Sequence, residues 1–215
     1  MSQFWFDMDG TLAKFLFGSP LSEVKSERYL FELPPNESIV EASKAVPAYV
    51  LSAYFTDCDH AVPEKKQWNK KWTNIPEERQ FYLPCGESKG VYYRPGRILI
   101  DDRGVHCKEW ADAGGVYVKV SVNSQDAEIE RTRHRFVVSP DMTVAEVLEI
   151  LRQAEKEEEM KYFLMRENRK GSSQPSLVTF DHSFDRLQQT MKKMQEKDPG
   201  RKYVITTMKG ERNEF

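Results

Sequence analysis

Short runs of consecutive apolar residues recur along the first two thirds of the chain, and each run ends at polar or small residues. The runs are Phe4-Trp5-Phe6, Tyr49-Val50-Leu51, Ile98-Leu99-Ile100, Val116-Tyr117-Val118 and Phe136-Val137-Val138. Unbroken apolar strands of this length are typical of a parallel sheet that is covered on both of its faces. Such a sheet requires helices between its strands, so this pattern constrains the fold more than any other feature of the sequence.

Helical patterns do occupy the intervals between these runs. Apolar residues lie at helical spacing over residues 37–45 and 63–72, and again after Asp141, which can serve as an N-cap. The alternation predicts a doubly wound, mostly parallel α/β sheet.

Composition excludes several other classes of protein. The chain has 215 residues, of which 39% are hydrophobic and 31% charged, and its formal net charge is −2. A nucleic-acid polymer or a membrane is therefore not expected as a partner. The N-terminal residues lack the pattern of a signal peptide, so we expect a cytoplasmic protein. Its three cysteines are expected to be reduced thiols.

The character of the sequence changes after residue 155. We predict one α/β domain over residues 1–155, a linker over 156–175 and a small C-terminal unit over 176–215. The small unit has a βαβ-like pattern, and its helix places four apolar residues on one side: Phe184, Leu187, Met191 and Met194. About 40 residues bury little core, so this unit is expected to dock on another surface.

The first chemical signal is Asp7-Met8-Asp9-Gly10-Thr11, directly after the first apolar run. Strand side chains alternate, so Asp7 and Asp9 are expected on one side, at the carboxyl edge where open α/β sheets bind ligands. One aspartate can attack a phosphoryl group, and the other can donate and later remove a proton. Asp9 must then stay protonated above the ordinary carboxyl pKa of about 3.9. The alternative interpretation is a polar turn after a strand.

Three further signals follow along the chain, two of them at strand ends and one, Lys89, in a loop of small residues. The hydroxyl of Ser52 and the backbone N–H of Ala53 can bind a phosphate oxygen, although a serine there can also cap a helix. Lys89 can deliver an ammonium to the phosphate and to the nucleophile, although it can equally be a surface lysine. Asp101 and Asp102 end a fully apolar strand, and adjacent carboxylates there favour a bound Mg²⁺.

In this order, the four signals resemble the motifs of the haloacid-dehalogenase superfamily, over about residues 1–152. The resemblance implies a phosphatase in which Asp7 is the nucleophile and a metal ligand. It implies that Asp9 is the general acid and base and lends its backbone carbonyl to the metal. It also implies that Ser52 and Lys89 bind the phosphate, and that Asp101 or Asp102 binds the metal.

A narrower resemblance, carried by residues 64–72, Lys89 and residues 99–102, is to the deoxyribonucleotidase family, which removes phosphate from nucleoside monophosphates. The chain departs from that pattern because only 44 residues separate Asp7 from Ser52. The cap insertion, within residues 13–46, must therefore be short. Phe15 and Phe17 lie where a base could stack, but two aromatic residues beside a strand end favour the interpretation of packing.

The lysines near Trp68 and Trp72 are interpreted as surface residues around a buried helix face. On a helix, the two tryptophans form a buried face and we expect Lys65, Lys66, Lys70 and Lys71 to surround it. Lys66 is an alternative to Lys89 as the phosphate-binding ammonium. Lys89 is preferred because it lies in a loop 12 residues before Asp101. Residues 58–60 (Cys-Asp-His) are interpreted as a loop.

The sequence thus predicts a Mg²⁺-dependent phosphomonoester hydrolase that acts on a small phosphorylated metabolite, with a nucleoside monophosphate favoured by the resemblance. The alternative is a phosphate-ligand-binding or interaction module whose C-terminal unit recruits a partner. A phosphomutase is less favoured because a short cap shields the intermediate poorly from water.

Overall fold

The structure is a computed structural model that describes residues 2–15, 18–159, 162–166, 176–181, 184–199, 203–207 and 212–213. The chain divides into two compact units, Met1–Glu155 and Lys156–Phe215, which are described separately below. None of the helices among the described residues is both long enough and apolar enough to cross a bilayer.

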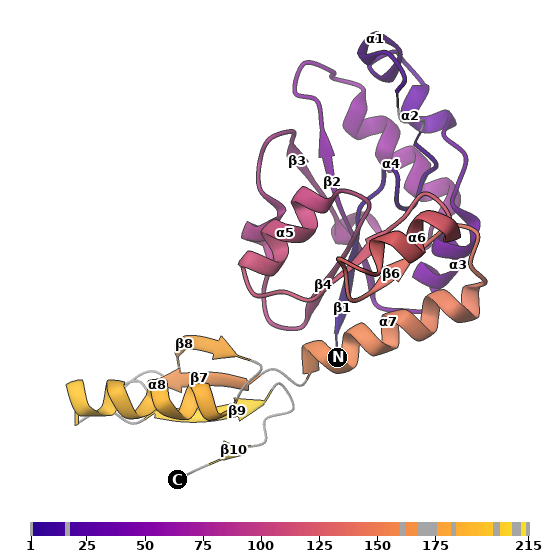
Figure 1. Cartoon of the computed structure of the whole chain (residues 1–215). Coiled ribbons are helices and arrows are strands. Elements are labelled where there is room, and N and C mark those ends of the chain that lie inside the picture. The colour runs from indigo at the N-terminus through magenta and orange to yellow at the C-terminus, as the bar shows by residue number, and fades with distance from the viewer. Residues whose placement is uncertain are drawn as a thin grey trace. The chain divides into compact units, whose positions relative to one another are not determined.

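The first unit contains a six-stranded sheet in which every neighbouring pair of strands is parallel, in the order β3-β2-β1-β4-β5-β6 (Figure 1). The strands are β1 (Gln3–Phe6), β2 (Ala48–Tyr54), β3 (Gln80–Pro84), β4 (Arg97–Asp101), β5 (Tyr117–Val120) and β6 (Val137–Val138). This order is Rossmann-like and doubly wound, with a reversal of strand order between β1 and β4. The predicted α/β class and its five strands are confirmed.

Strand β3 was not predicted, because it lies at the edge of the sheet and is less apolar than the others. Only Leu83 of its five residues is buried. The central strands show the opposite pattern, since Phe4, Trp5 and Phe6 of β1 are buried on alternate faces of the sheet. A strand at the edge of the sheet is less covered than a central strand, so it does not need apolar residues on both of its faces.

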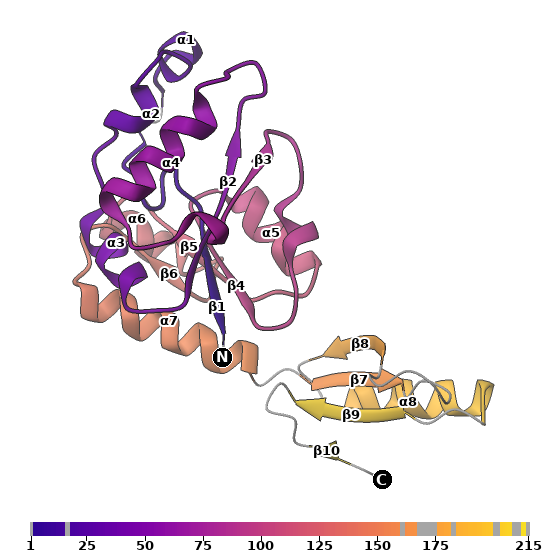
Figure 2. The ribbon, with the colours of Figure 1, turned by 180° about the vertical axis from the view of Figure 1, so that it is seen from behind.

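Helices cover both faces of the sheet, and Figures 1 and 2 show α4 and α5 on opposite sides of it. The helices beside the sheet are α3 (Glu37–Lys44), α4 (Ala61–Trp72), α5 (Gly104–Asp112), α6 (Ser124–Glu130) and α7 (Val144–Glu159), and two 3₁₀ turns are η1 (Glu77–Arg79) and η2 (Lys89–Tyr92). The helical patterns at residues 37–45 and 63–72 correspond to α3 and α4. Trp68 anchors α4, because it is fully buried and its indole N–H donates to the Leu33 carbonyl at 2.7 Å.

The predicted N-cap residue of α7, Asp141, is wrong. Thr143 precedes the helix and exchanges hydrogen bonds with Glu146: its backbone N–H donates to the Glu146 carboxylate at 2.8 Å, and its hydroxyl accepts from the Glu146 N–H at 3.3 Å. This is a capping box. Asp141 instead accepts hydrogen bonds from the Ser124 N–H and the Ser139 hydroxyl.

A short insertion between β1 and β2 forms the helices α1 (Leu21–Val24) and α2 (Tyr29–Glu32), which lie beyond the ends of the strands in both views (Figures 1 and 2). The buried carboxylate of Glu64, on α4, accepts hydrogen bonds from three backbone N–H groups of this insertion. The donors and their distances are Arg28 at 2.5 Å, Leu30 at 3.1 Å and Phe31 at 3.4 Å. One side chain therefore fastens the insertion to the sheet-covering helix.

The second unit contains a four-stranded sheet in the order β10-β9-β7-β8, with helix α8. Its elements are β7 (Tyr162–Arg166), β8 (Ser176–Asp181), α8 (Phe184–Lys197), β9 (Tyr203–Thr207) and β10 (Arg212–Asn213). Strand β7 is antiparallel to both β8 and β9 and lies between them. The predicted βαβ-like pattern is thus a pair of codirectional strands separated by β7.

The predicted linker over residues 156–175 is therefore partly wrong. Helix α7 continues to Glu159, and β7 occupies residues 162–166. The charged residues there are compatible with a helix, and the pairing that defines β7 involves distant strands. Residues 167–175 lie outside the described residues. Leu187, Met191 and Met194 do share one side of α8, where they pack with Ile205 and Tyr203, whereas the Phe184 side chain is outside the description.

We expect the substitution Glu64→Ala to lower the free energy of unfolding by about 3 kcal/mol, because it leaves three backbone N–H groups without their charged acceptor. Urea denaturation measures this change. Glu77→Ala is the matched control, because Glu77 is exposed and pairs with exposed Lys66; it should change stability by less than about 0.5 kcal/mol. Equal stability losses for the two variants would contradict this role of Glu64.

Candidate active site

The candidate site lies at the carboxyl edge of the sheet, where the strand order reverses. Asp7 directly follows β1, and its backbone N–H donates to the Ile100 carbonyl of β4 at 2.9 Å. This ladder contact places Asp7 beside Asp101, the last residue of β4. Open α/β sheets bind ligands at this kind of switch point.

Lys89 joins these two strand ends. Its ammonium is fully buried and lies 3.0 Å from Asp7 Oδ1 and 2.6 Å from Asp101 Oδ2. Burial by itself would lower the pKa of Lys89, but Asp101 and Asp7 outweigh burial and raise it. The ammonium therefore remains charged and neutralises part of the charge of the two carboxylates.

The carboxylate of Asp101 is fully occupied by donors. Besides Lys89, its Oδ1 accepts from the backbone N–H of Arg103 at 2.8 Å, and its Oδ2 lies 3.1 Å from His106 Nδ1. Burial opposes ionisation of Asp101, yet Lys89 and His106 more than compensate and lower its pKa to about 2. Asp101 is therefore an ionised structural partner of Lys89.

Asp102 has a different environment from its neighbour. Its carboxylate lies against Gly10, where an added Cβ would be 2.5 Å from Asp102 Oδ2, and Gly10 itself has φ of +81°. The Oδ1 atom is buried and has no hydrogen-bond partner. Burial, reinforced by the charges of Asp7 and Asp101, raises the pKa of Asp102 to about 8. Such a carboxylate requires either a proton or a cation.

Asp9 and Ser52 are joined by a lysine that the sequence analysis did not assign to the site. Lys65 is almost fully buried, and its ammonium lies 2.5 Å from Asp9 Oδ2 and 2.8 Å from Ser52 Oγ. Burial raises the pKa of Asp9; Lys65 opposes this effect, and Asp7 adds to it. The net direction is upward, so a proton is held more tightly on Asp9 than on an ordinary aspartate.

The prediction that the lysines of α4 only surround a tryptophan face is wrong for Lys65. Lys65, Trp68 and Trp72 are spaced i, i+3 and i+7, so they share one helix face. This spacing was the signal that could have placed Lys65 inside. Lys66, the considered alternative, is partly exposed and pairs with Glu77 at 3.3 Å, away from the site.

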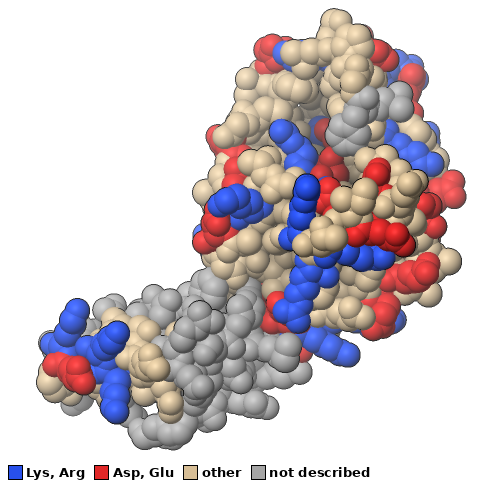
Figure 3. Space-filling view, in the orientation of Figure 1, with Lys and Arg blue, Asp and Glu red and all other residues tan. Residues whose placement is uncertain are grey.

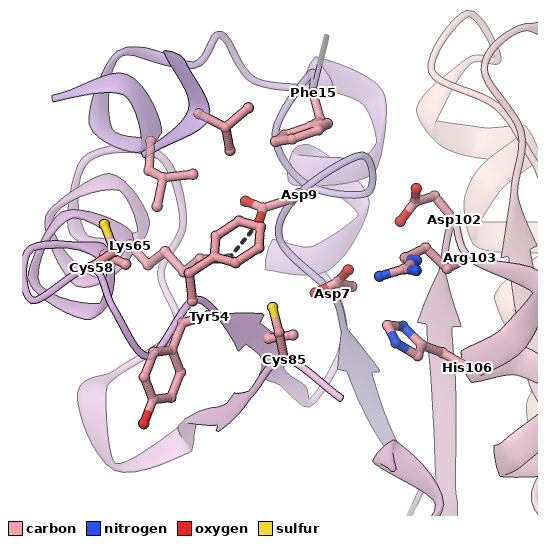
Figure 4. A pocket seen from close by; sticks show the side chains of 15 residues that line it. Asp7, Asp9, Phe15, Tyr54, Cys58, Lys65, Cys85, Asp102, Arg103 and His106 are labelled. Carbon is pink, nitrogen blue, oxygen red and sulfur yellow. Dashed lines mark hydrogen bonds and ion pairs between the residues drawn. The ribbon is translucent and has the colours of Figure 1, made fainter. Parts of the chain in front are cut away.

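A cavity of about 340 Å³ opens above these residues (Figure 4). One part is polar and contains Asp7, Asp9, Lys65, Asp102, Arg103 and His106. The other part is mostly apolar, and its lining residues include Phe15, Val24, Leu30, Tyr54, Phe55 and Ala61. The cavity can therefore receive a molecule with one anionic end and one apolar end.

The predicted site residues occupy different places relative to this cavity. Ala53 lines it, whereas Ser52 and Lys89 are buried and are not among its lining residues. Phe15 packs edge to face against Tyr29, with ring centroids 6.2 Å apart, as the packing interpretation predicts, and it also forms part of the cavity wall. Phe17 lies outside the described residues.

Asp7, Asp101 and His106 also form a possible metal cluster, because ligand atoms from all three lie within 4.8 Å of one another. The Lys89 ammonium contacts both aspartates of this cluster, and a second cation in the same position would be repelled. The unpartnered oxygen of Asp102 is the better candidate for a metal ligand.

Within the described residues, the cysteines and residues 58–60 form no further cluster of metal-binding side chains. The three cysteines are free, and residues 58–60 lie in a turn where Cys58 Sγ is 3.2 Å from His60 Nε2. Basic and acidic side chains are interspersed over the visible face of the first unit (Figure 3).

No known family model matches the chain, and no curated protein matches it. The function of the chain is therefore inferred from the geometry of the site.

We expect Lys89→Met to lower the free energy of unfolding by about 3–5 kcal/mol in the presence of a chelator, because it leaves two buried carboxylates without their cation. The double variant Lys89→Met/Asp101→Asn should recover part of this loss, since it also removes one of the charges. Urea denaturation of the two single variants and the double variant measures the coupling. Strictly additive losses would show that Lys89 contributes packing and not charge.

Proposed function

We propose that the chain is a Mg²⁺-dependent phosphomonoester hydrolase of the haloacid-dehalogenase type, which forms an aspartyl-phosphate on Asp7. The observation that carries this proposal is the pair of carboxylates that follows β1. Each lies beside a buried ammonium, Lys89 for Asp7 and Lys65 for Asp9, and burial still raises the pKa of Asp9 above that of an ordinary aspartate. Paired carboxylates in contrasting environments can divide the roles of nucleophile and acid.

In the first step, a carboxylate oxygen of Asp7 attacks phosphorus, and the bond from phosphorus to the alcohol oxygen breaks. That oxygen takes the proton from Asp9 and leaves as the alcohol. In the second step, Asp9 removes a proton from water, which attacks the aspartyl-phosphate and releases inorganic phosphate. Asp7 is thereby regenerated as a carboxylate, and Asp9 is again protonated.

Three cationic or polar groups support these steps. Lys89 holds the Asp7 carboxylate in position from beneath the cavity. Lys65 borders the cavity next to Asp9 and Ser52, so its ammonium is placed to bind a phosphate oxygen as well as to orient Asp9. Ser52 is then a partner of Lys65 at the phosphate end of the cavity.

The residues present fit a magnesium ion. Mg²⁺ prefers oxygen ligands, and the Asp102 carboxylate offers a buried oxygen without a hydrogen-bond partner. We assign the protein ligands to the carboxylates of Asp7 and Asp102 and the backbone carbonyl of Asp9. Asp101 is not assigned, because its oxygens already accept from Lys89 and Arg103. When bound, the ion would neutralise negative charge on the phosphoryl oxygens.

The substrate is a small phosphomonoester whose uncharged part lies against the apolar walls of the cavity. Phe15, Tyr54 and Phe55 offer aromatic surface there. This surface and the resemblance to deoxyribonucleotidases favour a nucleoside monophosphate. A binding or interaction module remains the second candidate, because residues 156–215 form a separate compact unit and the proposed reaction uses none of them.

We expect phosphate release from a panel of nucleoside monophosphates, sugar phosphates and a chromogenic aryl phosphate to require Mg²⁺ and to stop when a chelator is added. Asp7→Asn should lower the rate by at least about 1,000-fold, because it removes the nucleophile. Asp112→Asn is the matched control, since Asp112 is an exposed partner of Lys108 on α5. Unchanged turnover in Asp7→Asn would refute the mechanism, and no release from any substrate would favour the binding module.

Lys65→Met should lower kcat by about 10- to 100-fold, because it removes an ammonium beside the proton donor and the phosphate. The control is Lys66→Met, one residue away on the same helix but partly exposed and paired with Glu77. Steady-state kinetics on the best substrate of the panel compares the two. An equal effect of both substitutions would show that the α4 lysines act only through helix stability or surface charge.

A further inference from the structure

A second cavity, of about 250 Å³, lies beside the first. Phe15 and Asp102 line both cavities, so they form the partition between them. The other residues of the second cavity come from the turn after β1, from the start of α3 and from the ends of β5 and β6: Gly10, Lys14, Asn36, Lys119, Val120, Ser121, Val122 and Pro140. The proposed mechanism uses none of these side chains.

The notable member of this cavity is Lys119, at the carboxyl half of β5. Only 8% of its surface is exposed. Its ammonium donates to the carbonyl oxygens of Asp102 and of Val120, the latter at 2.7 Å. Within the described part of the chain, no carboxylate oxygen lies within the 4.0 Å of an ion pair with this ammonium. Two carbonyl oxygens occupy two of its three N–H donors.

A buried ammonium with only neutral acceptors is unfavourable, because buried charges in proteins are normally paired or bound to an ion. The lining of the second cavity adds a further positive charge at Lys14, and Asp102 is the only acidic residue among its described lining residues. Because Asp102 is assigned to Mg²⁺ in the proposed enzyme, the net charge of the cavity would then be positive. Ser121, which is also buried, adds a hydroxyl donor beside Lys119.

We propose that the second cavity is an anion subsite, which binds a second acidic group of the substrate through Lys119. The inference rests on the proposed phosphatase function, since it places the reacting phosphate in the first cavity and the second anion across the Phe15–Asp102 partition. The substrate class is a phosphomonoester that carries a carboxylate or a second phosphate. A free inorganic anion has the same chemistry, and the experiment separates the two sources.

The test compares pairs of substrates that differ by one acidic group: an aryl phosphate with and without a ring carboxylate, and an alkyl phosphate with and without a terminal carboxylate or second phosphate. Wild type should prefer the acidic member of at least one pair by about 10- to 100-fold in kcat/KM, mainly through KM. Lys119→Met should reduce that ratio to about 1. A ratio within one variant is insensitive to partial loss of active protein.

The conservative variant Lys119→Arg should keep part of the preference for the acidic substrate, because it keeps the positive charge. If Lys119 had only a structural role, the preference would not depend on that charge. Lys108→Met, on the exposed surface of α5, is the control and should keep the full ratio. If circular dichroism shows that Lys119→Met does not fold, Ser121→Ala and Lys14→Met replace it, and each should lower the ratio by about threefold. An unchanged ratio in every variant overturns the proposal.

The failure of the subsite and the failure of the enzyme give different results. Hydrolysis of both members of every pair at equal efficiency by wild type overturns the subsite and leaves the phosphatase intact. If wild type hydrolyses nothing, calorimetric titration with inorganic phosphate or sulfate tests the cavity directly. Binding that is lost in Lys119→Met then supports an anion site for a free ion, whereas no binding overturns it. If sulfate binds but wild type hydrolyses both members of every pair with equal kcat/KM, the cavity binds a separate anion. That result overturns the proposal that the second acidic group of the substrate binds there.

Discussion

The contact of the Lys89 ammonium with Asp7 and Asp101 is the interaction on which the rest of the site depends. It allows two carboxylates at the ends of neighbouring strands to remain buried and close together. Because Lys89 and His106 hold Asp101 in its ionised form, Asp102 is left as the acid that turns toward Gly10 and the cavity. The geometry of the candidate metal and phosphate site follows from this one buried cation.

The parallel sheet explains why acidic residues gather at one place. All six strands of the first unit point in the same direction, so the residues that follow them meet at one edge. At the point where the strand order reverses, β1 and β4 are direct neighbours. The hydrogen bonds between them bring Asp7 next to Asp101. The helices of the short insertion then add apolar walls, which Glu64 fastens to α4.

In the proposed enzyme, the two cavities together select the substrate. The first combines the acidic and basic groups of the proposed reaction with aromatic walls, and the second contributes a buried lysine whose ammonium donates to two backbone carbonyl oxygens. Phe15 and Asp102 belong to both. A ligand that spans them would be recognised by one apolar surface and two separate sets of charges, which is a stronger constraint than either cavity alone.

The sequence by itself determined the parallel α/β class and the strand ends that carry Asp7 and Asp101, because apolar runs and their polar ends are local features; it placed Ser52 at a strand end too, whereas β2 continues two residues beyond it to Tyr54. It did not identify edge strand β3, strand β7 or the role of Lys65. Strand pairing at β7 and burial of a lysine both depend on residues that are distant in sequence. Only the tertiary structure decided that Lys65 lies inside and Lys66 outside, and that Asp101 is fully bonded while Asp102 is not. A charge is buried only where other elements supply its partners, and that requirement is not written in local sequence.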